Sequence, residues 1–272
     1  MLKTEEELSS LHNPKLKRSL ALYKKNVRDE SGLFLIEGYR ELFRALEGNV
    51  AIEELFFCPE FFLGSNEDKL IEKIALAAPA YRCFPKVFAK LSYRDRPDGL
   101  IAVARQKKLS LGSLKALLKN SARPPFLVIA ESIEKPGNLG TILRSSDGAG
   151  ADALILADEK TDLHNPNVVR ASVGTLFTLP VVSASSQETL AFLKAEKIRL
   201  VAATPQSDLL YTRADLRGPL AIAVGTEQLG LSRDWLNEAE LKVKIPMLGK
   251  ADSLNVASAT TLVLYEVLRQ RS

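Results

Sequence analysis

Six short apolar runs in the second half of the chain are the strongest constraint on its fold. They alternate with stretches in which apolar residues recur at helical spacing. Strands that are apolar on both faces are buried on both faces, as in parallel sheets covered by helices. We therefore predict a parallel α/β sheet that ends in a long helix over 254–270. The six runs are FLVIA (126–130), ALILA (153–157), FTLPVV (177–182), IRLVAA (198–203), LAIAVG (220–225) and LKVKIP (241–246).

The first hundred residues contain a smaller alternation of helix and strand patterns. Helical spacing over 14–28 leads into SGLFLIEG, which is typical of a turn, a short strand and a glycine stop. Further helices are predicted over 39–46 and 69–77, and further strands over 52–57, 81–84 and 100–104. The stretch 106–125 contains a basic run and the breaker SARPP, which is typical of a connector. We predict a small α/β domain over 1–108, a linker over 109–125 and a larger domain over 126–272.

Composition excludes several classes of protein. The 272 residues are 46% hydrophobic and 26% charged, which is typical of a globular chain. No apolar run approaches the roughly 18 residues of a membrane span, and MLKTEEELSS lacks the apolar stretch of a signal peptide. We therefore expect a cytoplasmic protein with no membrane partner. Two cysteines and two histidines, without metal-ligand spacing, predict buried thiols and no metal site.

The positive charge of the chain is concentrated near its start. The net charge is +4, and residues 1–109 contain 19 Lys and Arg against 16 Asp and Glu. A basic face can bind nucleic acid by neutralising phosphates, without sequence preference. The pattern fits a solvated helix face equally well. The candidate RNA-binding residues are Lys15, Lys17, Arg18, Lys24, Lys25 and Arg28.

Two glycine patterns resemble nucleotide-binding motifs but lack the context that the chemistry requires. The pattern GAGADA (148–153) follows a helix and precedes a strand, whereas a dinucleotide fingerprint follows a strand and opens a helix. We interpret its glycines as a helix C-cap. The pattern GTEQLGLS (225–232) has P-loop spacing, but Leu231 replaces the phosphate-binding lysine. It predicts a strand followed by a glycine-rich turn that contains one carboxylate, Glu227.

A third stretch, EKPGNLGTILRS (134–145), follows the first strand of the larger domain and begins a helix. We predict Asn138 as its N-cap, with Arg144 further along the helix. Spacing alone favours a structural interpretation, in which Asn138 is only a cap and Arg144 only a surface charge.

The C-terminal tail strengthens the case for a ligand site. The loop IPMLG (245–249) interrupts the last strand pattern, and the helix that follows begins with the polar residues Asp252, Ser253 and Asn255. These residues, together with the two polar stretches above, follow the carboxyl ends of three strands. In an open parallel sheet this edge is where ligands bind.

Together these motifs resemble the SpoU/TrmH family of SPOUT RNA ribose 2′-O-methyltransferases. The motifs occur in family order as PGNLGTILRSSDGAGA (136–151), AVGTEQLGLS (223–232) and IPMLGKADSLNVASATTLVLYE (245–266). The resemblance covers 126–272. NPKLKRSLALYKKNVRDESGLFLIEG, starting at Asn13, is similar to the ribosomal-protein-like substrate-binding extension of the family.

The resemblance implies a C-terminal trefoil knot, a homodimer formed through the knotted domain, and S-adenosylmethionine as cofactor. It implies no metal, since methyl transfer from a sulfonium needs none. General topology rules treat knots as rare exceptions, so the residue patterns alone predict an ordinary open sheet. The residues that the resemblance implies for cofactor binding, mainly through their backbone, are Thr204, Gly225, Ile245, Met247 and Leu254.

The resemblance also implies Arg144 as the group that activates the ribose hydroxyl. A guanidinium stays protonated in proteins and is a poor base. We therefore prefer a role in which Arg144 holds the target phosphate and stabilises the developing alkoxide. Asn138, Ser253 and Asn255 would orient the ribose and the cofactor loops, and Glu227 would organise the glycine turn.

Two residues depart from the family pattern. Gln228 stands where glycine is frequent, so the turn cannot easily use a positive φ there, and Thr226 replaces a more common asparagine or small residue. Neither change removes a proposed catalytic side chain.

The leading hypothesis is methylation of ribosomal RNA, 23S rRNA in particular, because a whole α/β domain precedes the larger one. The alternatives are a tRNA ribose methyltransferase and a non-catalytic RNA-binding member of the fold. The hypothesis of a nucleotide-dependent small-molecule enzyme rests only on the two rejected glycine patterns.

Overall fold

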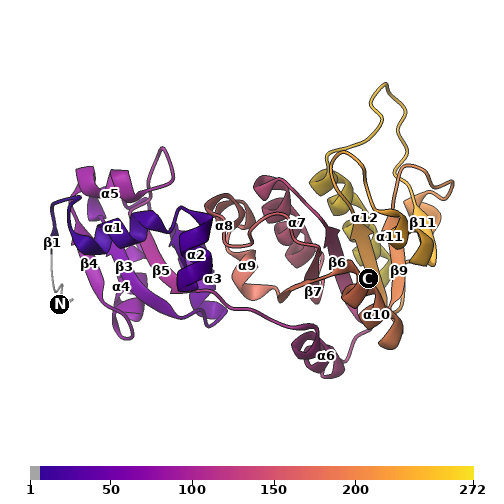
Figure 1. Ribbon diagram of the computed structural model, residues 1–272, viewed down its shortest axis with the longest axis horizontal. Coiled ribbons are helices and arrows are strands. Elements are labelled where there is room, and N and C mark those ends of the chain that lie inside the picture. The colour runs from indigo at the N-terminus through magenta and orange to yellow at the C-terminus, as the bar shows by residue number, and fades with distance from the viewer. Residues whose placement is uncertain (1–6) are drawn as a thin grey trace. The chain divides into compact units, whose positions relative to one another are not determined.

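The computed structural model describes residues 7–272 and contains two compact units (Figure 1). The first unit consists of the described residues up to Lys107 together with Asp162–Thr178. The second consists of Lys108–Thr161 and Leu179–Ser272. The start of MLKTEEELSS, where we expected no signal peptide, lies outside the described residues.

The first unit is built on a five-stranded sheet in the order β1-β4-β3-β5-β2. β5 runs antiparallel to both of its neighbours, and the remaining pairs are parallel. The strands predicted over 52–57, 81–84 and 100–104 and the helices predicted over 39–46 and 69–77 are present, with ends that shift by at most two residues, whereas the strand Glu7–Leu8 and the helices Pro59–Phe61 and Pro85–Leu91 were not predicted. The strands are β1 (Glu7–Leu8), β2 (Leu33–Glu37), β3 (Ile52–Phe57), β4 (Ala80–Cys83) and β5 (Leu100–Arg105). The helices before the linker are α1 (Pro14–Ala21), α2 (Lys25–Ser31), α3 (Tyr39–Glu47), η1 (Pro59–Phe61), α4 (Glu67–Ala75) and α5 (Pro85–Leu91).

The helical pattern over 14–28 forms two helices instead of one. The backbone carbonyl of Leu22 accepts a hydrogen bond from Nη1 of Arg28 at 2.7 Å. In a continuous helix the same carbonyl would accept from the amide four residues ahead. The arginine therefore satisfies a carbonyl at the break between α1 and α2, and its own side chain becomes buried.

Both cysteines lie in the core that α1 and α5 form against the sheet, as the sequence predicted. Cys58 and Cys83 are almost inaccessible, and burial is the main cause that raises the pKa of each thiol to about 12.

The segment Asp162–Thr178 belongs to the first unit, although it lies between two strands of the second unit in sequence. It forms α8 (Pro166–Ser172) and α9 (Thr175–Thr178), which pack against β2 and α3. The carboxylate of Asp162 accepts hydrogen bonds from Nε of Arg28 at 2.9 Å and from Nη2 of the same side chain. A buried ion pair therefore joins residues that are 134 positions apart.

The second unit contains a six-stranded, wholly parallel sheet in the order β11-β9-β10-β6-β7-β8. This confirms the parallel α/β sheet predicted from the apolar runs. The strand predicted over 177–182 was placed too early, because Phe177 and Thr178 belong to α9 and Pro180 precedes the strand. The strands are β6 (Phe126–Glu131), β7 (Ala153–Ala157), β8 (Val181–Ala184), β9 (Arg199–Ala203), β10 (Leu220–Val224) and β11 (Leu241–Val243). The helices are α6 (Leu111–Lys119), α7 (Pro136–Gly148), α10 (Ser186–Ala195), η2 (Tyr211–Arg213), α11 (Arg233–Glu238) and α12 (Val256–Arg271).

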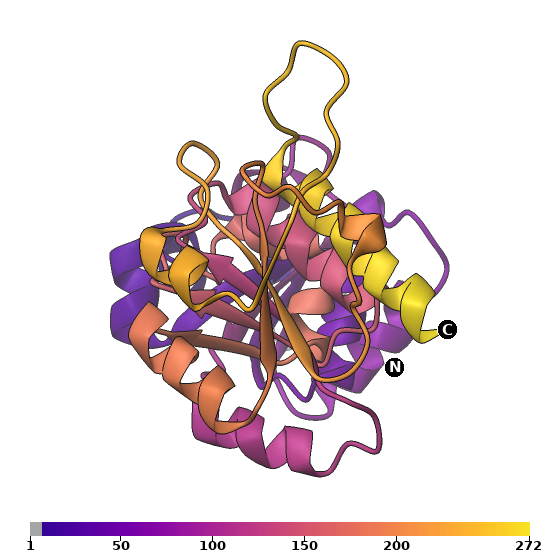
Figure 2. The ribbon, with the colours of Figure 1, turned by 90° about the vertical axis from the view of Figure 1, so that its right-hand side faces the viewer.

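Helices cover both faces of this sheet. On one face Leu114, Leu193 and Trp235, from α6, α10 and α11, pack in a single core with the strands. On the other face α12 packs along α7 and β10. Figure 2 shows α12 in yellow on one side of the strands and the orange helices α10 and α11 on the other.

The order of the strands indicates which edge of the sheet can bind a ligand. The chain runs outward from β6 to β7 and β8, and then crosses to β9 on the other side of the sheet. β6 and β10 are neighbours at this change of direction. The loops after these two strands therefore diverge at the carboxyl edge, which is the position where open α/β sheets bind ligands.

Candidate functional site

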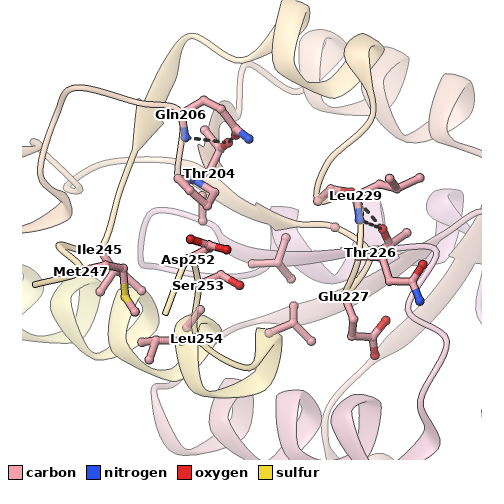
Figure 3. Close-up of a pocket in the computed structure, with 18 of the residues that line it drawn as sticks. Thr204, Gln206, Thr226, Glu227, Leu229, Ile245, Met247, Asp252, Ser253 and Leu254 are labelled. Carbon is pink, nitrogen blue, oxygen red and sulfur yellow. Dashed lines mark hydrogen bonds between the residues drawn. The ribbon is translucent and has the colours of Figure 1, made fainter. Parts of the chain in front are cut away.

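A cavity lies at this edge, between the loops that follow β9, β10 and β11 (Figure 3). Its enclosed volume is about 190 Å³, and the cavity opens to solvent at its mouth. All five residues predicted to bind the cofactor line it: Thr204, Gly225, Ile245, Met247 and Leu254. Glu227 and Ser253 also line it.

The loop after β10 is a tight turn held by its own backbone. The amide of Thr226 donates to the carbonyl of Gly230 at 3.0 Å, and the amide of Gly230 donates back at 3.1 Å. A Cβ on Gly225 would lie 2.2 Å from the backbone of Gly230, so this position accepts only glycine. The positive φ of the turn is at Gly230 (+70°), whereas Gln228 has no positive φ. The departure at Gln228 is therefore compatible with the turn.

The loop after β11 differs from this turn in its backbone hydrogen bonding. No backbone–backbone hydrogen bond involves 245–254 among the described residues. The segment projects from the second unit (Figure 2), and the side chain of Leu248 within it is fully exposed. The loop ends at Asn255, the N-cap of α12, which begins two residues later than predicted, and the side chain of Asn255 accepts from the amides of Ala257 and Ser258. The free N–H and C=O groups are available to a ligand.

A chain of three polar side chains connects the elements around the cavity. Nδ2 of Asn255 donates to Oδ1 of Asn138 at 3.1 Å, and Nδ2 of Asn138 donates to Oε1 of Glu227 at 2.7 Å. Oε1 of Glu227 also accepts from the amide of Lys135 at 3.3 Å. The chain therefore ties the start of α7, the glycine turn and the start of α12 together.

Asn138 is not the N-cap of its helix, so that prediction was wrong. The N-cap is Lys135, and α7 begins at Pro136, which suits a first helical position because it needs no N–H donor. Asn138 is the third residue of the helix, within its first turn. Its side chain is consequently free to reach Glu227 and Asn255 instead of the backbone.

The glutamate in this chain is held as a carboxylate. Partial burial raises the pKa of Glu227, but hydrogen bonds from Asn138 and from backbone amides lower it more. The net pKa lies below the ordinary value of 4.5. Glu227 therefore acts as an acceptor that orders the turn and is unsuited to donate a proton near neutral pH.

The family of the chain follows from this geometry and from comparison with known proteins. A model of the SpoU rRNA methylase family matches residues 125–265, which is more than half of the chain and contains the sheet and the cavity loops. The chain belongs to the SpoU rRNA methylase family. A model of the MRM3-like substrate binding domain matches residues 13–102. The resemblance seen in the three sequence motifs is confirmed.

Three similar proteins extend over nearly the whole chain. A 23S rRNA (uridine(2479)-2′-O)-methyltransferase of Streptomyces viridochromogenes is 32% identical, with 91% of this chain and 86% of the relative covered. A crystal structure described as an RNA 2′-O ribose methyltransferase is 41% identical, with a TM-score of 0.83 and coverage of 97% and 99%. An AdoMet-bound rRNA methyltransferase from Sinorhizobium meliloti is 30% identical, with a TM-score of 0.86 and 97% of each chain covered.

Arg144 of this SpoU family chain lies apart from the other predicted catalytic residues. It is exposed on α7 and does not line the cavity. It lies six positions after Asn138, which corresponds to about 9 Å along a helix axis. The structure thus brings Asn138, Glu227, Ser253 and Asn255 to the cavity region but leaves Arg144 outside it.

The predicted basic face is only partly accessible. Lys17 and Lys24 are exposed, while Nζ of Lys15 lies 5.0 Å from the ring centre of Tyr81. Arg18 and Lys25 are exposed but form ion pairs with acidic neighbours, Arg18 with Glu54 at 3.1 Å and Lys25 with Asp29 at 2.6 Å.

Arg28 does not belong to this face, and its assignment as an RNA contact was wrong. Its side chain is 3% exposed and paired with Asp162. A buried, paired guanidinium cannot reach a phosphate.

Two residues that the sequence interpretation did not assign also border the cavity. Gln206 lies in the loop after β9, and its side chain hydrogen-bonds to Thr204 (Figure 3). Asp252 lies beside Ser253 on the opposite wall. The sequence contained a signal for Gln206, because this residue follows a predicted strand by three positions and so lies at the same carboxyl edge.

No group of three or more His, Cys, Asp or Glu side chains among residues 7–272 could hold a metal ion. Within the same part of the chain, no helix is long and apolar enough to cross a membrane.

Proposed function

We propose that this chain transfers a methyl group from S-adenosylmethionine to a ribose 2′-hydroxyl of ribosomal RNA, with 23S rRNA as the substrate. The observation that carries the proposal is the cavity at the carboxyl edge, where two of the three sequence motifs, 223–232 and 245–266, meet the loop after β9. The functions of the relatives support it, since two of the three named above are rRNA methyltransferases. An rRNA substrate would place the activity in the cytoplasm.

The cavity suits the proposed cofactor. Its apolar lining includes Val243, Ile245 and Leu254, which match the flat face of an adenine ring. The unpaired backbone groups of 245–254 can hydrogen-bond the edge of that ring and the ribose hydroxyls. When bound, S-adenosylmethionine supplies the methyl group that the ribose oxygen takes up by in-line displacement. Thr204, Gly225 and Met247 complete the set of residues that would hold it.

The side chains of the site would position the RNA and manage charge. The chain from Asn255 through Asn138 to Glu227 fixes the loops, so that the ribose meets a preorganised wall. Ser253 on that wall would orient the ribose. The guanidinium of Arg144 would hold the phosphate and stabilise the alkoxide that forms as the 2′-hydroxyl proton leaves to water.

We further propose that Arg144 acts in the cavity of a second copy of the chain. Its exposure outside its own cavity supports a contribution in trans. Leu262 and Tyr265 are 40% and 48% exposed on α12, which packs along α7, and so offer an apolar face for a twofold contact. A homodimer through α7 and α12 would unite the separated groups.

A trefoil knot of the C-terminal segment is also part of the proposal. β11 is the edge strand of the sheet. The next element, α12, packs against α7 and against β10, which lies near the middle of the sheet. The connection 244–255 shares the cavity with the turn after β10, which fits a chain that passes through that loop. Tracing the chain path in an experimental structure tests this proposal.

The function is tested by transfer of labelled methyl to unmodified 23S rRNA, 16S rRNA and bulk tRNA. We expect label in 23S rRNA, recovered as an alkali-resistant dinucleotide, which identifies ribose methylation. Label in tRNA alone would support the tRNA alternative. Absence of both label and S-adenosylmethionine binding would support the non-catalytic alternative.

The variant Arg144→Ala should lower turnover by about 10²- to 10³-fold, the range for loss of one preorganised electrostatic donor. Cofactor affinity, measured by calorimetry, should not change. Arg233→Ala, at an exposed arginine on α11, is the matched control and should retain full activity. Unchanged turnover in Arg144→Ala would remove the role assigned to this residue.

Action in trans predicts complementation. Arg144→Ala and Gly225→Ala should each lose most of the activity, the second because its turn is displaced. Mixed dimers contain one intact cavity that receives Arg144 from the other copy, so random mixing should restore about a quarter of the parent activity. No restoration would place Arg144 in its own cavity.

A further inference from the structure

A narrow groove on the first unit lies between the loop 92–98 and helix α8. Tyr23, Tyr93, Arg94 and Arg170 are among its lining residues. Tyr93 is 46% exposed, and its ring stacks on Tyr23 with centroids 5.8 Å apart and an interplanar angle of 27°. An exposed aromatic ring supported from behind by a second ring has the form of a stacking platform.

The platform is held rigidly from below. The amide of Tyr93 donates to Glu37 at 2.8 Å, and the hydroxyl of Ser92 donates to the same carboxylate. The hydroxyl of Tyr23 donates to the carbonyl of Leu91 at 2.6 Å. These bonds fix the two rings before any ligand arrives, which lowers the entropy cost of binding.

A second set of bonds fixes the loop that carries Tyr93. Nη2 of Arg94 donates to Glu41 at 2.8 Å and to the carbonyl of Glu37 at 2.9 Å, and Nη1 donates to Asp98 at 3.0 Å. Glu37, Glu41 and Asp98 are all buried. Their carboxylates accept hydrogen bonds inside the domain, and Glu37 also lines the groove.

The exposed charges around the groove are mainly positive. Arg170 lines it from α8 and is exposed, and one of its nitrogens donates to Asn167 at 3.2 Å. Arg96 is exposed on the loop that carries Tyr93, where Asp95 is the one exposed acid. Aromatic rings next to arginines are the combination that binds unpaired nucleotides, by stacking the base and neutralising the phosphate.

We propose that this groove binds an unpaired nucleotide of the RNA substrate, with the base stacked on Tyr93 and the adjoining phosphates held by Arg170 and Arg96. This proposal rests on the proposed function in one respect, namely that RNA is the ligand. It does not depend on the methyl transfer. Arg94 and Glu37 are positioning residues that hold the platform.

Arg170 makes the inserted segment part of this site. It lies on α8, in the stretch 162–178 that follows β7 in sequence but belongs to the first unit. Residues 13–102, which match the substrate binding domain, therefore lack one wall of the groove. The test requires the full chain.

The binding test uses fluorescein-labelled RNA, one single-stranded 12-mer of mixed sequence and one blunt-ended duplex of the same strand with its complement. Tyr93→Ala should weaken binding of the single strand by roughly 5- to 150-fold, the range for loss of one stacked base. Tyr93→Phe keeps the ring and should bind within about twofold of the parent. Duplex binding should change by less than about twofold in both Tyr93 variants, because paired bases are not available for stacking.

Phe84→Ala is the matched control, because Phe84 is 47% exposed on the same unit but lies at the other end of α5. It should bind the single strand like the parent. Arg170→Ala should reduce the slope of log affinity against log salt by about 0.7, as expected for one phosphate contact on a single strand. Thermal unfolding of each variant checks that the fold is retained.

The outcomes separate this proposal from the methyltransferase proposal. If no RNA is methylated but Tyr93→Ala still weakens single-strand binding and Tyr93→Phe does not, the groove stands and the enzymatic function fails. If the parent methylates rRNA and Tyr93→Ala binds single strands as the parent does, the groove proposal is overturned. Equal losses in Tyr93→Ala and Phe84→Ala, or no single-strand binding by the parent, would overturn it as well.

Discussion

The two units build their proposed ligand surfaces from different parts of the chain. In the second unit the cavity is bounded by loops whose backbone is shaped by glycine and left partly unpaired. In the first unit the groove consists of aromatic and arginine side chains held by buried carboxylates. Backbone loops at a sheet edge tolerate many side-chain changes but few changes of conformation. A surface made of side chains depends on single residues and on the ion pairs that place them.

The strongest test of this contrast is Asp162→Ala in the first unit. It leaves Arg28 buried without its partner, and breaking a buried ion pair costs about 3–5 kcal/mol. Hydrogen exchange of amides in β2 and α8 should accelerate accordingly, while cofactor binding by the second unit stays unchanged. Glu53→Ala removes the partially exposed partner of Arg105 and should cost under about 1 kcal/mol. Equal effects of the two variants would contradict the importance of the buried pair.

In the second unit the corresponding test changes backbone conformation. Gly225→Ala forces the turn to move, because its Cβ would lie 2.2 Å from Gly230, and overpacking costs about 1–3 kcal/mol. S-adenosylmethionine affinity, measured by calorimetry, should fall by about ten- to a hundredfold. Gly249→Ala in the neighbouring loop meets nothing within 4 Å and should bind like the parent. A normal affinity in Gly225→Ala would show that the turn is not rigid.

The smallest expected effect concerns the pH dependence of stability that Glu227 contributes beside the cavity. The pKa of Glu227 is lowered in the folded protein, so its stabilising contribution is present above the ordinary pKa of 4.5 and is lost as pH falls through the lowered value. Thermal unfolding between pH 6 and pH 3 should therefore decline less steeply in Glu227→Gln than in the parent. Parallel curves would show that Glu227 is not the group responsible.

Much of the fold was predictable because its signals are local. Apolar runs of five or six residues predicted the strands of the larger sheet, and the polar residues after them predicted the edge of the cavity. The five residues inferred for the cofactor from the motifs all line one cavity, although their role in binding stays a prediction. The N-cap at Asn255 was predictable for the same reason, since a cap involves neighbours two or three residues away.

The predictions that were wrong concern residues whose partners are far away in sequence. Arg28 has the pattern of a surface cation, but Asp162 lies 134 positions later and takes it into the interior. Asn138 has the composition of a cap, but Glu227 and Asn255, 89 and 117 positions away, bind its side chain. No local window contains such pairs.

The sequence by itself determined the parallel sheet, the order of the motifs and the family, because apolar periodicity and turn chemistry act over a few residues. Only the tertiary structure decided that 162–178 completes the first unit and that Arg144 lies outside the cavity to which the motifs assigned it. It also decided that Tyr93 and Arg170 share a groove. The physical reason is that burial and ion pairing depend on which distant segments meet, and that choice is made by the packing of the whole chain.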